Sequence, residues 1–203
     1  MTTPATFDRT YATQQLRRAA HPMRQVIKRF YINNILREVS GSTIDFGCGA
    51  GQLLRRLPSG SVGLEVNPYL VTKLRETGLD VLQYDPDLDR FALSELAPNK
   101  FRCLVIAHVL EHMPDAASTL HTLCRSCKRL GVEKIIVVVP GASGFKTDAT
   151  HRTFVDREYL RKGNLFSCEG YAIAKASYFP INIRVLGDYF AYHEFKFVYQ
   201  RLN

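Results

Sequence analysis

Residues 44–51 read Ile-Asp-Phe-Gly-Cys-Gly-Ala-Gly, an apolar run that ends in three alternate glycines. The run predicts a buried strand, and the leucines in residues 52–57 have the spacing of a helix face. The glycines therefore fall at a predicted strand-to-helix turn. Glycine allows positive φ and close approach of a ligand to the backbone, and the first N–H groups of a helix lack partners. We expect a ligand to bind at this turn, although a tight glycine turn without a ligand is the alternative.

The spacing of the glycines separates two classes of cofactor. The dinucleotide fingerprint G-x-G-x-x-G would need a glycine at position 52, where Gln52 stands. Asp45 instead lies two residues ahead of the first glycine. A carboxylate attracts an ammonium group and repels a pyrophosphate at close range. The turn therefore favours a cofactor with an amino group over a dinucleotide.

The pattern Asp-x-Gly-x-Gly-x-Gly resembles the first motif of the class I S-adenosylmethionine-dependent methyltransferases. The resemblance covers residues 42–140, and its most specific part is the run from Asp45 through Val109-Leu110-Glu111-His112. This run is similar to small bacterial methyltransferases of the methionine-biosynthesis-W-like and ubiquinone-methylase-like group. The resemblance implies S-adenosyl-L-methionine as cofactor, with Asp45 near its amino group and the glycine turn around its methionine portion.

Further cofactor contacts are expected where later strands end. Glu65 ends the second predicted strand, where a carboxylate can accept hydrogen bonds from both ribose hydroxyls, and Asp85 ends the third, beside the adenine amino group. Each could also be an ordinary polar strand end. Ligands of open parallel sheets lie outside the carboxyl ends of the strands, so the end of the fourth strand should lie beside the reacting methyl group. The expected cofactor-binding residues are Asp45, Gly47, Cys48, Gly49, Gly51, Glu65, Val66, Asp85, Ala107 and His108.

Two histidines are candidates for the catalytic base. Methyl transfer to an oxygen nucleophile requires removal of its proton, and histidine titrates near the working pH. His112 follows the fourth strand, and His151 lies in the long polar loop 141–154. Either could instead cap a turn or bond to the backbone. Asp148 is a candidate to orient the base, and the expected acceptor contacts are Asp148, Arg152 and, as a lid residue, Tyr11.

The alternation of predicted strands and helices indicates an α/β fold with a doubly wound, mostly parallel sheet. The resemblance implies seven strands in a Rossmann-like arrangement, ended by an antiparallel pair at about 171–179 and 194–202. Helices are expected directly after the glycine turn and over 88–96. Residues 1–40 should form an N-terminal helical cap, with a mobile start at 1–12 and a helix from Pro22, and residues 41–203 should form the methyltransferase domain.

The five cysteines lie mostly in apolar runs, which favours reduced, buried thiols. Cys124 and Cys127 form a C-x-x-C pair inside a predicted helix, on its apolar face. A zinc site would need a second pair with similar spacing, and the sequence has none. We expect the pair to pack in the core, and we expect no metal site.

The formal net charge is +8, and residues 1–40 hold seven basic and two acidic residues. Such a segment can attract an anionic acceptor or RNA, or it can simply be a solvated helix face. The mean hydropathy is −0.12, and no run of about 18 apolar residues is present. A polar N-terminal segment also lacks the apolar core of a signal peptide. A cytoplasmic monomer or homodimer without a membrane span is the expectation.

Several functions remain open. The first is methylation of a small-molecule acceptor, such as a hydroxyl of a sugar or glycan precursor. The second is an RNA methyltransferase, which is disfavoured because Ala107-His108-Val109-Leu110 stands where an Asn/Asp-Pro-Pro-aromatic motif would be expected. The third is a non-catalytic S-adenosylmethionine-binding subunit. A dehydrogenase is disfavoured by Gln52 and Asp45.

Overall fold

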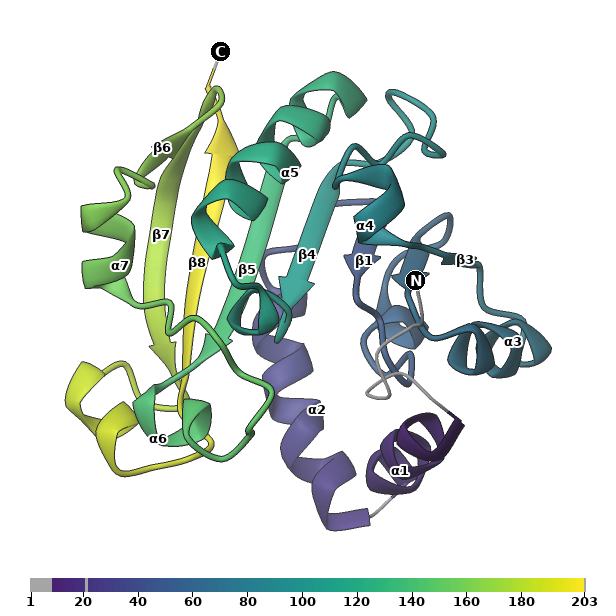
Figure 1. The fold of residues 1–203 in the computed structure, drawn as a ribbon, viewed down its shortest axis with the longest axis horizontal. Coiled ribbons are helices and arrows are strands. Elements are labelled where there is room, and N and C mark those ends of the chain that lie inside the picture. Colours follow the sequence, from purple (N-terminus) through teal and green to yellow (C-terminus); the bar gives the residue numbers. More distant parts are fainter. Residues whose placement is uncertain (1–8, 21, 203) are drawn as a thin grey trace.

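The computed structural model describes residues 9–20 and 22–202, without the side chains of residues 11, 18–20 and 22–25. Its centre is a sheet in the order β3-β2-β1-β4-β5-β8-β7-β6 (Figure 1). The strands are β1 (Thr43–Phe46), β2 (Val62–Glu65), β3 (Val81–Gln83), β4 (Cys103–Ala107), β5 (Lys134–Pro140), β6 (Ser167–Cys168), β7 (Tyr171–Phe179) and β8 (Glu194–Arg201).

The strand directions confirm the predicted α/β fold. Strands β1 to β5 pair in parallel, whereas β8 pairs antiparallel with both β5 and β7. The antiparallel pair lies where the resemblance implies it. The expected count of seven strands is wrong, because the two-residue strand β6 adds an eighth strand beside β7.

Helices cover both faces of this sheet. The α-helices are α1 (Arg9–Ala20), α2 (Pro22–Leu36), α3 (Pro68–Glu76), α4 (Pro86–Asp89), α5 (Ala116–Leu130), α6 (Ala142–Phe145) and α7 (Arg157–Lys162). The short 3-10 helices are η2 (Leu54–Arg56), η3 (Leu110–His112) and η4 (Arg184–Asp188). In the described ranges, no helix has both the length and the apolar character needed to cross a bilayer.

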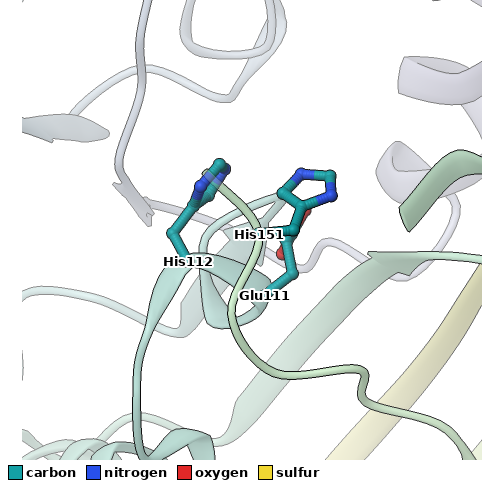
Figure 2. Close-up of side chains that lie close together, drawn as sticks. All are labelled: Glu111, His112 and His151. Atoms are coloured by element: carbon teal, nitrogen blue, oxygen red, sulfur yellow. The ribbon is translucent and has the colours of Figure 1, made fainter. Parts of the chain in front are cut away.

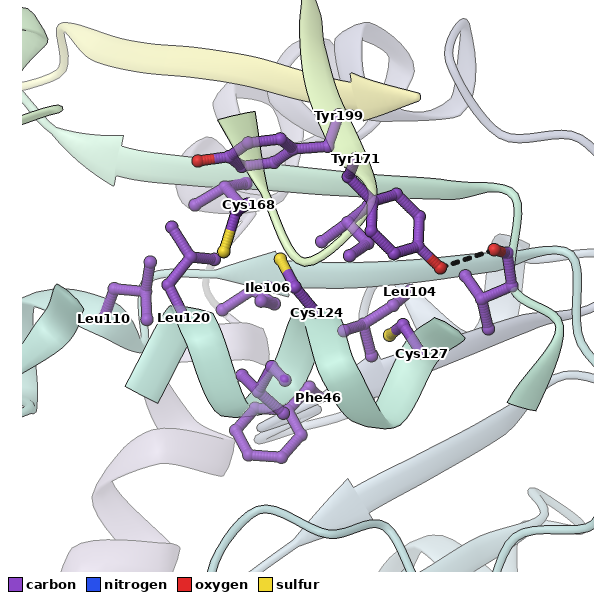
Figure 3. Packing of buried hydrophobic residues seen from close by; sticks show 14 of the residues in the cluster. Phe46, Leu104, Ile106, Leu110, Leu120, Cys124, Cys127, Cys168, Tyr171 and Tyr199 are labelled. Atoms are coloured by element: carbon purple, nitrogen blue, oxygen red, sulfur yellow. Dashed lines mark hydrogen bonds between the residues drawn. The ribbon is translucent and has the colours of Figure 1, made fainter. Parts of the chain in front are cut away.

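The core is divided by the sheet, because successive side chains of a strand point to opposite faces. Leu104 and Ile106 of β4 pack with α5 on one face, whereas Val105 packs with α2 on the other (Figures 1 and 3). Cys124 and Cys127 of α5 are free, buried thiols in the first of these clusters. Burial raises the pKa of the Cys127 thiol, so it stays protonated. The prediction that this pair packs in the core is confirmed.

The predicted helix directly after the glycine turn is wrong. Only the 3-10 helix η2 forms there, and Leu57 is already extended, with ψ of 156°. Pro58 follows, and a residue before proline avoids the helical region. The space between the last glycine and Pro58 is therefore too short for a stable α-helix.

The predicted helix over 88–96 is also wrong, since α4 ends at Asp89. Arg90, Phe91 and Leu93 follow with positive φ. The Asp89 carboxylate accepts hydrogen bonds from the N–H groups of Leu93 and Ser94, which stabilises a turn in competition with a helix.

The N-terminal segment differs from the expectation of a mobile start, because residues 9–12 are helical and belong to α1. Ala12 is fully buried, and the Arg9 guanidinium lies 5.3 Å from the centroid of the Tyr69 ring of α3. Residues 1–8 lie outside the described residues. Helix α1 thus packs beside α3, close to the β1–β2 side of the sheet. The division into a cap of residues 1–40 and a domain of residues 41–203 stays a prediction.

Loss of the N-terminal cap of α5 should destabilise the fold modestly. The exposed Asp115 carboxylate accepts a hydrogen bond from the N–H of Ser118 at 2.9 Å. We expect Asp115→Ala to lower the free energy of unfolding by about 1 kcal/mol, which corresponds to roughly 2–4 °C in a thermal melt. Asp115→Ser should retain most of the stability, because serine also caps helices. Equal melting temperatures for Asp115→Ala and the wild-type protein would contradict this role.

Candidate functional site

The glycine turn is attached to the end of strand β2. The N–H groups of Gly47 and Cys48 both donate to the carbonyl oxygen of Leu64, at 2.9 and 3.1 Å. The N–H of Gly51 donates to the carbonyl of Cys48. These N–H groups are therefore already paired, and only a three-residue 3-10 helix follows. The expectation that a helix N-terminus would offer free N–H groups to the cofactor is wrong.

The three glycines of the turn have positive φ for different reasons. A Cβ on Gly47 would lie 2.6 Å from Cγ2 of Val109, and one on Gly51 would lie 2.8 Å from Cδ2 of Leu74. These two glycines allow close packing against neighbouring elements. Among the described side chains, a Cβ on Gly49 would meet Oε1 of Gln15, at the ordinary contact distance of 3.9 Å. Packing against the described residues therefore does not require a glycine here, which leaves the backbone of Gly49 accessible to a ligand.

Asp45 is a buried carboxylate with an unsatisfied oxygen. Its side chain is 3% exposed, and Oδ2 has no hydrogen-bond partner among the described residues. Burial and the nearby Glu65 raise the pKa of Asp45 to about 7, against the opposing effects of Lys28 and the N–H of Leu54. An unpaired buried charge is unfavourable until a cation reaches it. This environment fits the ammonium group of an amino-acid portion.

Glu65 connects β2 to the glycine turn. Its Oε2 accepts from the N–H of Gly49 at 2.8 Å, and its Oε1 accepts from the N–H of Asn67 at 3.0 Å. Burial raises the pKa of Glu65 although these N–H groups favour the charged form. Each oxygen of an ionised carboxylate has a second lone pair. Glu65 can therefore hold the turn and accept hydrogen bonds from ribose hydroxyls.

The other expected adenosine contacts follow strands β2 and β3. Val66 is partly buried between Glu65 and Asn67. Asp85 is exposed and caps α4, because its Oδ1 accepts from the N–H groups of Asp87 and Leu88. The adenine role of Asp85 stays a prediction that would use its other oxygen.

The end of β4 is held by charged side chains. His108 follows Ala107 with a positive φ of 58°, and its N–H donates to the carbonyl of Val138. Its Nε2 lies 2.8 Å from Oε1 of Glu194, and its Nδ1 lies 3.3 Å from Oε1 of Glu111. Burial opposes its charge, but the two carboxylates outweigh burial and raise the pKa of His108 to about 9. This ring is protonated at neutral pH and cannot serve as a base there.

The tertiary structure brings the two candidate bases together, although they are 39 residues apart (Figure 2). The N–H groups of Arg152 and Thr153 donate to the carbonyl of Glu111 at 2.7 and 3.1 Å, which attaches the polar loop to η3. The ring centroids of His112 and His151 are consequently 4.8 Å apart. The ring of Phe145 stacks on His151 from α6.

Hydrogen bonds determine which ring nitrogen of each histidine is free. Nδ1 of His151 lies 2.8 Å from the carbonyl oxygen of Phe145, which can only accept. Nδ1 of His112 lies 3.0 Å from Oγ1 of Thr150, whose own proton goes to Oδ1 of Asp148. In the neutral form of each ring the proton therefore lies on Nδ1, and Nε2 has no hydrogen-bond partner among the described residues. Burial lowers the pKa of His112, so its ring is neutral at pH 7.

The predicted acceptor contacts surround this pair unequally. The carboxylate of Asp148 accepts a hydrogen bond from the hydroxyl of Thr150, which in turn contacts Nδ1 of His112. Asp148 bonds to His151 through its backbone carbonyl only. If Asp148 orients a base, that base is therefore His112. Arg152 is exposed. Tyr11 lies in α1, and its side chain lies outside the described residues.

Sequence reasoning missed three polar residues of this region. Glu111 is fully buried behind the histidines, Thr150 orients His112, and Glu194 pairs with His108. Of these three residues, only Glu111 could have been predicted from the sequence, because it directly precedes the candidate base His112. Glu194 could not be found, since it reaches the site through the antiparallel pairing of β8 with β5.

Comparison with known proteins gives a family and a set of similar folds. The model of a family described as a methyltransferase domain matches residues 15–172. A ubiquinone biosynthesis O-methyltransferase of Pseudoalteromonas translucida is 31% identical in an alignment of 93 residues, which covers 42% of this chain. The match spans only 39% of that relative's length.

Solved structures of low sequence identity share the fold. A SAM-dependent methyltransferase from Archaeoglobus fulgidus superposes with a TM-score of 0.66 at 18% identity, over 96% of this chain and all of that one. Magnesium protoporphyrin IX methyltransferase from Synechocystis PCC 6803, solved with bound SAM, has a TM-score of 0.66 at 15% identity, over 97% and 93% of the two chains. The N-methyltransferase NodS from Bradyrhizobium japonicum WM9, solved with SAH, has a TM-score of 0.65 at 14% identity, over 96% and 98%.

Proposed function

We propose, from the premise that this chain belongs to the S-adenosylmethionine-dependent methyltransferase family, that it methylates a hydroxyl oxygen of a small-molecule acceptor. The observation that carries this proposal is the pair of histidines with free Nε2 lone pairs, His112 and His151, beyond the carboxyl end of β4. In open α/β sheets this edge is where ligands bind.

The cofactor would be held at the β1–β2 turn. Asp45 would bind the ammonium group, Gly49 would let the methionine portion approach the backbone, and Glu65 would bind the ribose hydroxyls. When bound, S-adenosylmethionine supplies an electrophilic methyl group on a sulfonium. The unsatisfied oxygen of Asp45 and the accessible backbone of Gly49 support this assignment, since both fit a cationic amino-acid portion.

The histidine pair would position the acceptor and take up its proton. A hydroxyl must lose its proton as the oxygen attacks, and a neutral imidazole within hydrogen-bond reach can accept it. His112 is neutral because burial lowers its pKa, and Thr150 and Asp148 hold its orientation. Positioning of the oxygen in line with the methyl group lowers the barrier further, by roughly 7–11 kcal/mol in favourable cases.

One similar protein supports oxygen as the accepting atom, and the charge supports an anionic acceptor. The relative of 31% identity is an O-methyltransferase in ubiquinone biosynthesis, although the match covers only 39% of that relative's length. The net charge of +8 would attract a phosphorylated or carboxylated acceptor. A hydroxyl of a sugar or glycan precursor and a phenolic hydroxyl are both compatible with this site.

An acceptor screen tests the proposal. We expect mass spectrometry to show the gain of one methyl group on a hydroxyl compound, with one S-adenosylhomocysteine released per product. The panel should contain phosphorylated sugars, phenols, amines and short RNA. Methylation of an amine or of RNA, with no hydroxyl compound accepted, would contradict the proposal. RNA binding would also show a steep loss of affinity with salt.

A further inference from the structure

We propose that Glu111, His112 and His151 bind a divalent transition-metal ion, with Zn²⁺ as the best match to their chemistry. Each of the three offers one ligand atom, and these atoms lie within 4.8 Å of one another (Figure 2). Two imidazoles and one carboxylate are a known ligand set for catalytic zinc, which keeps a further coordination position open. No metal site is expected from the sequence, because Cys124 and Cys127 have no second cysteine pair with similar spacing.

The state of Glu111 is an independent observation that points to a cation. Its side chain is fully buried, and neither carboxylate oxygen has a hydrogen-bond partner among the described residues. Among the described residues, Oε1 forms an ion pair with the His108 ring, whose Nδ1 lies 3.3 Å away. Buried carboxylates are normally hydrogen-bonded, paired or bound to a metal. Oε2 has neither a hydrogen bond nor an ion pair among the described residues, so it is the oxygen available as a ligand.

Both histidines are arranged as metal-binding histidines usually are. A ligating imidazole typically donates its second ring N–H to a carbonyl, a carboxylate or another fixed acceptor. His151 donates from Nδ1 to the carbonyl of Phe145, and His112 donates from Nδ1 to Thr150, which is held by Asp148. The lone pair of each Nε2 is thereby kept for a ligand role.

The distances between the three ligand atoms allow an ion to bind after a small movement of the side chains. Bonds of about 2.0–2.2 Å in a tetrahedral site place ligand atoms roughly 3.5 Å apart. The widest separation in the cluster, at most 4.8 Å, would therefore have to close by about 1 Å. Side-chain rotation can supply this, because the His112 and His151 rings are only partly buried. The same partial exposure leaves room for an oxygen of another molecule at the ion. Imidazole ligands favour zinc and its neighbours over magnesium.

The role of the ion rests on the proposed function. An acceptor hydroxyl at the open position would have its pKa lowered, as water does on zinc. The O–H bond breaks and the proton leaves to water. The oxygen then forms a bond to the methyl carbon while the bond from that carbon to sulfur breaks, with the electron pair staying on sulfur. In this mechanism His112 and His151 would bind the metal ion. The ion, and not a histidine base, would then promote loss of the acceptor proton.

Binding of Zn²⁺ to the full chain, without cofactor or acceptor, tests the site directly. After chelator treatment and removal of the chelator, competition with a chromophoric zinc chelator should show one tightly bound ion per chain. Glu111→Gln and His151→Ala should each weaken binding by roughly 100-fold or more. Thr150→Val keeps all three ligands and removes the hydroxyl that orients His112, and it should weaken binding by roughly 10-fold.

His121→Ala is the matched control, because it removes a partly exposed histidine that has its own polar neighbours. Nδ1 of His121 lies 3.4 Å from Sγ of Cys168 and 3.5 Å from Oε1 of Glu169. Zinc binding that is lost in His121→Ala and retained in His151→Ala would overturn the proposal. So would wild-type binding no tighter than that of the Glu111→Gln variant.

A second measurement does not depend on the variants folding. Substitution of Co²⁺ into the wild-type protein should give visible ligand-field absorption of a four- or five-coordinate ion with nitrogen and oxygen ligands. Strong near-ultraviolet thiolate-to-cobalt absorption would instead place the ion on a cysteine and overturn the assignment. Zinc binding with the expected variant pattern, but with no hydroxyl compound methylated, would uphold the metal site and reject the proposed acceptor. Hydroxyl methylation that is undiminished in metal-free protein would reject the role of the ion.

Discussion

Replacement of Asp45 by asparagine is expected to weaken binding of S-adenosylmethionine by about 10- to 100-fold. The carboxylate is buried, and its Oδ2 has no partner in the part of the chain that the structure describes. An ammonium group placed there would gain a charged hydrogen bond, which contributes about 1.5–3 kcal/mol. Asparagine retains the shape of the side chain and removes its charge. Calorimetric titration of both proteins at pH 8 measures the difference.

The same substitution is expected to stabilise the protein in the absence of cofactor. The pKa of Asp45 is raised from 3.8 to about 7 in the folded state. Between these values the folded state holds a proton that the unfolded state has released, so stability due to this group falls as the pH rises from about 4 to about 7. Above pH 7 the folded state contains the unpaired charge. Asp45→Asn should therefore unfold at a higher temperature than the wild-type protein above pH 7, and the difference should shrink toward pH 4.

The pH dependence of cofactor binding should follow from the same titration. Below about pH 7 the Asp45 carboxyl is protonated in the free protein, so affinity for the ammonium group should decrease as the pH falls. The Asp45→Asn variant should lack this decrease. An unchanged dissociation constant in the variant at pH 8 would remove Asp45 from the cofactor site. It would also remove the main physical argument for cofactor binding at the glycine turn.

His151→Ala is expected to lower kcat by roughly 100-fold or more, while the dissociation constant for S-adenosylmethionine stays within about twofold. Removal of a group that takes up or controls the acceptor proton typically costs a factor of 10² to 10⁴. His151 lies in the loop attached to η3, on elements other than the β1–β2 turn. The substitution should therefore lower kcat without a matching loss of affinity for S-adenosylmethionine. Steady-state kinetics with the acceptor found by the screen, together with calorimetry of cofactor binding, measures both.

The control for this prediction is His121→Ala, which removes a histidine on α5 that pairs with Glu169 and should leave kcat within about twofold. His112→Ala should behave as His151→Ala does, because the two rings lie 4.8 Å apart and would serve one acceptor. Equal losses of turnover and cofactor affinity in His151→Ala would show a general disturbance of the site. In that case neither a base nor a metal ligand at position 151 could be maintained.

Local sequence signals predicted the elements of the sheet well. The run 134–140 coincides with β5, since uninterrupted β-branched residues favour a buried strand, and the run 171–179 coincides with β7, which is only partly buried. Asn67-Pro68 correctly marked the start of α3, because Asn67 accepts hydrogen bonds from the N–H groups of Tyr69 and Leu70. These features depend on neighbouring residues alone.

The two wrong helices show where local signals failed. The leucines after the glycine turn have helical spacing, but Pro58 leaves too little length for an α-helix. Over 88–96, hydrogen bonds from Ser94 and Leu93 to the Asp89 carboxylate compete with the helix. Hydrophobic spacing reports which side chains are buried, and it does not report how side-chain acceptors reorganise the backbone between them.

The sequence by itself determined the five parallel strands, the glycine turn with its acid, and the family to which the chain belongs, because each depends on residues that lie close together along the chain. Only the tertiary structure decided how Glu111, His112 and His151 meet, and that Asp148 acts on His112 through Thr150. The physical reason is that backbone hydrogen bonds from Arg152 and Thr153 to Glu111 attach the loop to η3. Such contacts between distant segments have no periodicity or spacing by which a sequence could reveal them.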